Sequence, residues 1–150
     1  MLVSRDGAVK LIDFGIARAA TRATHTKTGH MRGKLAYAAP EQISAGPVDA
    51  RSDVFSLGVL LYEAAALTRP FVGESEPAIV AAIMEGRRKK LCEARPDAGP
   101  LAAAIDRAIE LEPSARWPSA EAFGEALKRE LGAPLPGPIV LRELVAKVMA

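Results

Sequence analysis

The run VFSLGVLLYEAAAL at residues 54–67 constrains the fold more than any other part of this chain. It is longer than an ordinary strand, and it is shorter than the roughly 20 mostly apolar residues that a membrane-spanning helix needs. It also contains a serine, a glycine and a glutamate, which suit a protein interior better than lipid. We therefore predict a helix buried in the core of a soluble, cytoplasmic domain.

The composition fits one ordinary globular domain. The chain has 150 residues, of which 49% are hydrophobic, so it can bury a sizeable core. Its formal net charge is only +2, which argues against a general nucleic-acid-binding protein. The single cysteine, Cys92, cannot form an internal disulfide, and this fits a reducing compartment. No signal-peptide pattern begins the chain.

From residue 52 onward the apolar residues recur at helical spacing. Ser52 or Asp53 is expected to cap the first long helix, and Ser119 the last, because their side-chain oxygens can accept from free backbone amides. The expected helical segments are 39–43, 53–67, 76–86, 100–111 and 119–131.

The two ends of the chain have a different character. Residues 1–12 contain two short apolar runs around an Asp-Gly pair, which predicts a β-hairpin. Residues 16–38 are rich in threonine, lysine and arginine without an acid, which indicates a long loop. A stiff PLPGP linker at 134–138 precedes residues 139–149, which are predicted to form a short amphipathic helix. The predicted fold class is therefore mainly α with a short N-terminal β-hairpin.

Four spaced motifs point to one family. They are DFG (13–15), GKLAYAAPE (33–41), DVFSLG (53–58) and PSARWPSA (113–120). In this order they resemble the C-terminal lobe (C-lobe) of a serine/threonine protein kinase of the bacterial, eukaryotic-like type. The resemblance implies the α+β kinase fold with its N-terminal lobe (N-lobe) absent from these residues, a C-lobe portion over 1–132, and a linker with a helix over 133–150.

The resemblance assigns residues 13–41 to the activation segment. Asp13 would bind the Mg²⁺ that bridges the ATP phosphates, since a carboxylate on a tight turn suits a hard cation. Phe14 and Gly15 would let this turn pack inward and move. Mg²⁺ and ATP are thus the implied cofactors.

Threonines in the basic loop are candidate phosphorylation sites. Phosphate on such a residue adds about 1.5–2 negative charges and can order a loop by pairing with arginine. Thr26 and Thr28 are the first candidates, followed by Thr24. The alternative is that these threonines merely solvate the loop.

The segment GKLAYAAPE resembles the part of the family where a peptide substrate docks, here at Gly33, Lys34 and Tyr37. Lys34 stands where most members have threonine, which puts ordinary serine/threonine specificity in question. Lys34 could still pair with a carboxylate as a point charge.

Four further residues have structural roles in the resemblance. Glu41 would form a buried ion pair with Arg116, and Asp53 would anchor the backbone of the catalytic loop. Gly58 belongs to the same helix motif as Asp53.

Three other features have ordinary explanations. RRKK at 87–90 is expected to be a solvated helix terminus, where cations complement the helix dipole, rather than a nucleic-acid patch. His25 and His30 lie in the loop without companion ligands, and Trp117 is expected to pack at the core or its edge.

Several parts of a kinase do not occur in these 150 residues. They contain no glycine-rich loop, no strand lysine motif and no HRD catalytic loop. The isolated chain is therefore expected to lack kinase activity. Three hypotheses remain: part of a kinase whose N-terminal half lies before Met1, a non-catalytic kinase remnant that binds peptide-like partners through 33–48 and 76–86, or a degraded gene product.

Overall fold

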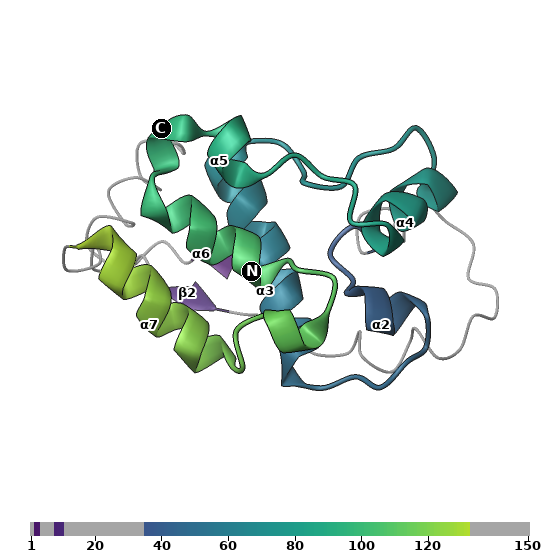
Figure 1. Cartoon of the computed structure of the whole chain (residues 1–150), viewed down its shortest axis with the longest axis horizontal. Helices are drawn as coiled ribbons and strands as arrows, with labels where there is room; N and C mark the ends of the chain where they lie inside the picture. Colours follow the sequence, from purple (N-terminus) through teal and green to yellow (C-terminus); the bar gives the residue numbers. More distant parts are fainter. Residues whose placement is uncertain (1, 4–7, 11–34, 133–150) are drawn as a thin grey trace.

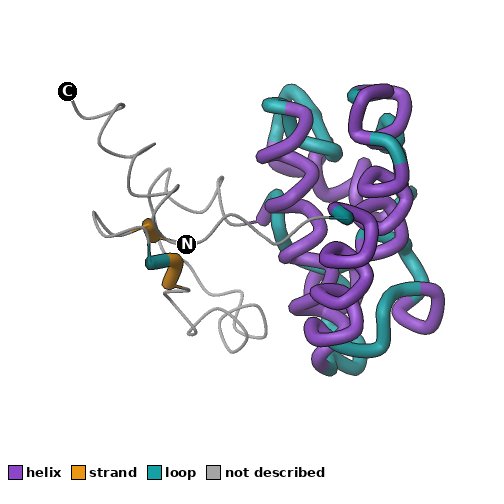
Figure 2. The backbone as a smooth tube through the Cα atoms, turned by 90° about the vertical axis from the view of Figure 1, so that its left-hand side faces the viewer, coloured by secondary structure: helices purple, strands orange, loops and turns teal. Residues whose placement is uncertain are grey.

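The computed structural model describes residues 2–3, 8–10 and 35–132 of the chain (Figure 1). Strands β1 (Leu2–Val3) and β2 (Val9–Lys10) pair antiparallel, with Leu2 opposite Lys10 and Val3 opposite Val9. The predicted N-terminal pair of strands is therefore present. Figure 2 shows it to one side of the helices.

Residues 35–132 are helical or form the connections between helices. Helix α3 is the longest and packs against α5, α6 and α7, so it forms the centre of the group. Figure 1 shows α6 lying along α3, with α7 beside α6. The helices are α2 (Pro40–Ile43), α3 (Ala50–Ala66), α4 (Glu76–Met84), α5 (Leu91–Ala94), α6 (Pro100–Ala108) and α7 (Ala120–Leu131), with 3₁₀ turns η2 (Pro96–Ala98) and η3 (Pro113–Ala115). Among the described helices none is long and apolar enough to cross a membrane.

Side-chain caps set where the helices begin. The Ser119 hydroxyl accepts from the Ala122 amide at 3.1 Å, as the sequence predicted, and Ser75 caps α4 in the same way. The predicted cap of α3 was wrong. Asp49 caps it by accepting from the Arg51 amide at 2.8 Å, so the helix begins at Ala50.

One other prediction needs correction, and one helix was missed. The segment predicted as a helix over 100–111 ends at Ala108, and the following residues pass through a turn and η3. The short helix α5 was not predicted, because a single turn carries too little periodicity to recognise.

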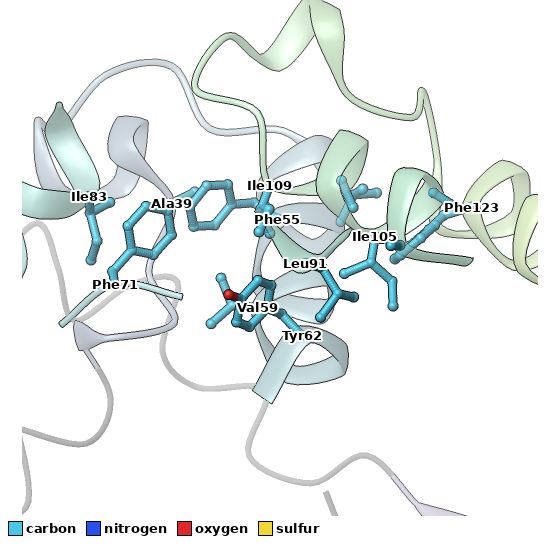
Figure 3. Packing of buried hydrophobic residues seen from close by; sticks show 14 of the residues in the cluster. Ala39, Phe55, Val59, Tyr62, Phe71, Ile83, Leu91, Ile105, Ile109 and Phe123 are labelled. Carbon is cyan, nitrogen blue, oxygen red and sulfur yellow. The ribbon is translucent and has the colours of Figure 1, made fainter. Parts of the chain in front are cut away.

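The core lies around α3. Phe55 is fully buried and stacks on Phe71, with ring centroids 5.9 Å apart. Figure 3 shows Phe71 and Ile83 on one side of Phe55, and Ile105 and Phe123 on the other. Residues from α3, α4, α6 and α7 therefore share one apolar interior.

Candidate functional site

The chain between residues 35 and 43 is fastened to α3 by specific hydrogen bonds. The Ala38 amide donates to the Leu35 carbonyl at 3.1 Å, which closes a turn just before α2. The Ala39 amide donates to Oε1 of Gln42 at 2.9 Å, and Ala39 itself is fully buried. On α3, the Ser56 hydroxyl donates to the Tyr37 carbonyl at 2.8 Å. This segment therefore has a fixed path over the helical body.

Glu41, in the first turn of α2, forms an ion pair with Arg116. Nη1 of Arg116 donates to Oε1 of Glu41 at 2.7 Å, and Nη2 donates to Oε2 at 2.9 Å. The Ser52 hydroxyl adds a third donor to the carboxylate at 2.6 Å. The side chain of Arg116 has 0% of its surface exposed and that of Glu41 has 11%. The pair is therefore bidentate and almost completely withdrawn from water.

Backbone carbonyls satisfy the rest of the Arg116 guanidinium. Its Nε donates to the carbonyl of Glu110 at 2.7 Å. Its Nη2 also donates to the Leu111 carbonyl at 2.7 Å, and Nη1 to the Arg51 carbonyl at 3.1 Å. All five N–H donors of the guanidinium thus have a partner, and its carbon lies 4.8 Å from the centre of the Phe55 ring.

Opposing influences act on the pKa of Glu41. Burial raises it, but the hydrogen bonds from Arg116 and Ser52 favour the charged form and outweigh burial. The pKa of Glu41 therefore lies below its ordinary value, and the carboxylate is ionised at neutral pH.

A second polar group surrounds Tyr37. Its hydroxyl donates to Oε2 of Glu63 on α3, and Nε of Arg69 donates to the other oxygen of that carboxylate at 3.4 Å. The Arg69 guanidinium also lies 5.8 Å from the centre of the Tyr37 ring. Burial and the Glu63 carboxylate together raise the pKa of Tyr37. The phenol therefore stays protonated and held in one orientation.

Asp53 and Gly58 both lie on α3 but in different surroundings. Asp53 is exposed in the first turn, and its carboxylate has no hydrogen bond or ion pair to another described residue. Its role as a backbone anchor remains a prediction. Gly58 is buried where α3 crosses α6, and a Cβ there would lie 2.7 Å from Cγ2 of Ile109 and 2.8 Å from Cβ of Ala108.

The prediction for RRKK was wrong at one of its four positions. Arg88 is not solvated: 7% of its side chain is exposed, and Nη1 donates to Oδ1 of Asp106 at 2.5 Å. Asp106 in turn accepts from the Leu91 amide, at 3.1 Å to each oxygen. This buried pair joins the chain after α4 to α6 and holds the start of α5.

Sequence reasoning missed Asp106, Arg88, Glu63 and Ser52 as members of these networks. For Asp106 a signal was available, since it lies at a core-facing position between Ala102 and Ile109 on the predicted helix. An acid on an apolar helical face needs a cationic or hydrogen-bonding partner. The sequence could not say which of four consecutive cations supplied it.

Trp117 packs at the edge of the core, as predicted. Its ring stacks near Phe123 with centroids 6.4 Å apart, and its Nε1 donates to the Ala104 carbonyl at 2.9 Å. The Arg107 guanidinium covers the ring at 4.0 Å.

The predicted metal ligand and phosphorylation sites lie outside the described residues, as do His25 and His30. Within the part of the chain that the structure describes, no three His, Cys, Asp or Glu side chains gather as a metal site. The residues outside the described ranges are Asp13, Phe14, Gly15, Thr24, Thr26, Thr28, Gly33 and Lys34.

Comparisons with known proteins agree on one family. The protein kinase domain family matches residues 1–125. The tyrosine-protein kinase MasK of Myxococcus xanthus is 43% identical over 138 residues, which cover 91% of this chain and 21% of MasK. The serine/threonine-protein kinase PknL of Mycobacterium tuberculosis is 51% identical over 75 residues, which cover 50% of this chain and 19% of PknL. The chain thus spans about a fifth of the length of these curated relatives.

A solved structure gives the same result for the fold. The autoinhibited serine kinase domain of the giant muscle protein titin matches with a TM-score of 0.56 and 29% sequence identity. The match covers 63% of this chain and 30% of that one.

Proposed function

The chain belongs to the protein kinase domain family, and on this premise we propose that it serves as the C-lobe part of a bacterial serine/threonine protein kinase. Its mainly helical fold is that of a kinase C-lobe. The proposed activity of the whole protein is transfer of the γ-phosphoryl group of ATP to a serine or threonine hydroxyl of a protein substrate.

The Glu41–Arg116 pair is the observation that carries the proposal. It joins the end of segment 13–41 to the helical body. Four residues earlier in this segment, Tyr37, the candidate substrate-docking residue, is bonded to Glu63 and Ser56 of α3. A rigid platform of this kind suits a segment that must hold a polypeptide beside a reacting phosphate, because phosphoryl transfer depends mainly on positioning and electrostatics.

Family membership implies Mg²⁺ and ATP. We assign the metal to Asp13, since a carboxylate oxygen is the ligand that Mg²⁺ prefers. When bound, the metal neutralises charge on the phosphates. The described residues do not test this assignment, because Asp13 lies outside them.

We further propose that these 150 residues alone do not transfer phosphate. They contain no glycine-rich loop, strand lysine or HRD motif. A positioned general base alone is worth about 10²–10⁴ in rate.

The test incubates the purified chain with radiolabelled ATP, Mg²⁺ and casein, beside the Asp13→Ala variant. We expect equal background from both. Label transfer that Asp13→Ala abolishes would show that the chain is a kinase on its own. The protein isolated from its source cells should transfer label, and hydrolysis of the product should yield phosphoserine or phosphothreonine. Phosphotyrosine would place this chain with MasK in specificity.

The second candidate function is a non-catalytic binding module. Two exposed apolar side chains on the predicted docking segments favour it, Val48 at 50% and Met84 at 41% exposure. Stable production of the 150-residue chain as a separate product in its source cells, with no labelling activity from the isolated protein, would select this function over the first.

A further inference from the structure

A cavity of about 740 Å³ lies away from the Glu41–Arg116 pair. It opens between the C-terminal end of α3, residues 68–72 that follow it, residues 87–89 after α4, and the end of α5. Its volume falls within the range of about 300–1,000 Å³ that is usual for ligand sites. It is larger than a single inorganic anion requires.

Four cationic side chains line this cavity, and none of the described residues in its lining is acidic. They are Arg69, Arg87, Arg88 and Lys89. Arg88 is committed to its buried pair with Asp106. Arg69, Arg87 and Lys89 are at least partly exposed, so a ligand in the cavity can reach their charged groups.

Arg87 keeps free donors, whereas Arg69 is engaged. Nε of Arg69 bonds to Glu63 and its guanidinium also interacts with Tyr37. Nε of Arg87 bonds to Glu85, and its terminal nitrogens Nη1 and Nη2 have no hydrogen-bond partner among the described residues. The Nζ atom of Lys89 has none there either. A guanidinium whose two terminal nitrogens are free can bind a carboxylate through both oxygens.

Exposed ion pairs do not prevent this binding. Side-chain exposure is 61% for Arg87 and 58% for Glu85, and pairs this open contribute little to stability. An incoming carboxylate can therefore share or replace the present partner at small cost.

The wall that carries these cations is held in place. The Tyr62 hydroxyl on α3 donates to the Lys89 carbonyl at 2.9 Å, and the Arg88–Asp106 pair ties the neighbouring residue to α6. Little backbone order must therefore be gained on binding, which favours affinity.

The remaining lining is largely apolar. Tyr62, Ala66, Pro70, Val72 and Ala94 contribute to it, and Val72 is 67% exposed. A ligand that fits would combine anionic groups with apolar ones and extend over several residues. We propose that this cavity binds an acidic segment of a partner protein in which glutamate or aspartate alternates with apolar residues.

A peptide is favoured over a membrane surface because the cations line one cavity together with apolar side chains instead of spreading over a face. The low net charge of +2 also argues against a broad electrostatic attraction to lipid or nucleic acid. The proposal concerns binding alone and does not depend on kinase activity.

The test measures fluorescence anisotropy of a labelled peptide that alternates glutamate and leucine, titrated with the full 150-residue chain. The matched peptide replaces glutamate by lysine. We expect saturable binding of the acidic peptide only. Absence of saturable binding, or equal binding of both peptides, would overturn the proposal.

Two double variants locate the site. Arg87→Glu with Lys89→Glu reverses two cations of the cavity, and Lys128→Glu with Arg129→Glu reverses two exposed cations on α7. Both change the net charge equally. We expect the cavity variant to weaken binding at least about tenfold, by loss of charge-assisted hydrogen bonds, and the α7 variant to have little effect. Equal weakening by both would mean attraction to net charge alone and would reject the site.

Circular dichroism melts establish that each variant is folded. If the charge-reversed cavity variant is not folded, Arg87→Gln with Lys89→Gln replaces it, and the same loss of binding is expected.

Sedimentation with vesicles of equal parts phosphatidylserine and phosphatidylcholine tests whether the cavity binds lipid headgroups instead of a peptide. Vesicle binding that the cavity variant abolishes, without peptide binding, would assign the cavity to lipid headgroups and overturn the proposal.

Discussion

Arg116 and Glu41 lie 75 positions apart in the sequence, yet two parallel hydrogen bonds of 2.7 and 2.9 Å join them. The carboxylate comes from α2, at the end of segment 13–41, and the guanidinium comes from the turn before α7. Because Arg116 also binds carbonyls of Arg51, Glu110 and Leu111, one buried side chain links α2, the start of α3 and the chain after α6. The position of the candidate docking segment therefore depends on this contact.

Arg116→Ala should be the most destabilising change within this network. It leaves the Glu41 carboxylate and three carbonyls without their donor, and removing one partner of a buried pair costs about 3–5 kcal/mol. Glu41→Gln should cost less, because Arg116 keeps its three carbonyl acceptors. Urea unfolding of the full chain measures both, and a larger loss for Glu41→Gln would contradict this account.

The same pair predicts a pH dependence. Because the pKa of Glu41 is lower in the folded chain than its ordinary value of 4.5, its contribution is complete above that pH. It is lost as the pH falls through the lower folded-state value. The difference in Tm between wild type and Glu41→Gln should therefore narrow between neutral pH and about pH 3. A constant difference over this range would exclude Glu41 as the titrating group.

The helical part of the fold could be predicted wherever local signals are strong. Helix α7 has a serine cap, apolar periodicity and a terminal glycine, and both of its ends were predicted correctly. The start of α3 was misplaced because Asp49, Ser52 and Asp53 are all good caps, and the sequence does not show which one faces the free amides. In the structure Ser52 is buried and bonds to Glu41 instead.

Some contacts of the candidate site could be predicted from the sequence, and others could not. The resemblance suggested Glu41 with Arg116, because a family pattern carries information about distant contacts. Nothing local indicated that Glu63 would accept from Tyr37, or that Arg88 would pair with Asp106. Such contacts depend on how helices pack in three dimensions, which periodicity alone does not specify.

Arg88 and Arg87 are neighbours in the sequence, but the ion pair of Arg88 is buried and that of Arg87 is exposed. Arg88→Gln should cost about 3–5 kcal/mol, because it leaves the buried Asp106 carboxylate without its cation. Arg87→Gln removes only an exposed pair and should change stability by less than about 1 kcal/mol. Thermal melts of the two variants decide this, and similar Tm values for both would show that the Arg88–Asp106 pair does not stabilise the fold.

Tyr37→Phe removes the hydroxyl that donates to Glu63 without changing the ring. Since a hydrogen bond to a charged group contributes about 1.5–3 kcal/mol and Tyr37 is only half-buried, we expect a loss near 1.5 kcal/mol. A double-mutant cycle with Glu63→Gln isolates the pairwise interaction. Strict additivity of the two changes would mean that the hydroxyl and the carboxylate are not coupled.

Gly58 permits the close approach of α3 and α6. Alanine there would place its Cβ 2.7 Å from Ile109 and 2.8 Å from Ala108, and the alanine methyl group cannot rotate away. Overpacking of this kind costs about 1–3 kcal/mol, and the higher helix propensity of alanine returns up to about 1 kcal/mol. Gly58→Ala should therefore destabilise the chain.

Gly124→Ala on α7 is the matched control, because nothing lies within 4 Å of the added Cβ. Propensity then acts alone, and the variant should be more stable by about 0.5–1 kcal/mol. Urea unfolding of both variants should give free-energy changes of opposite sign. A gain in stability for Gly58→Ala would mean that α3 and α6 can separate at little cost. Phe55 lies on α3 near Gly58, and its ring contacts the Arg116 guanidinium. A stable Gly58→Ala variant would therefore also mean that this contact does not require close packing of α3 against α6.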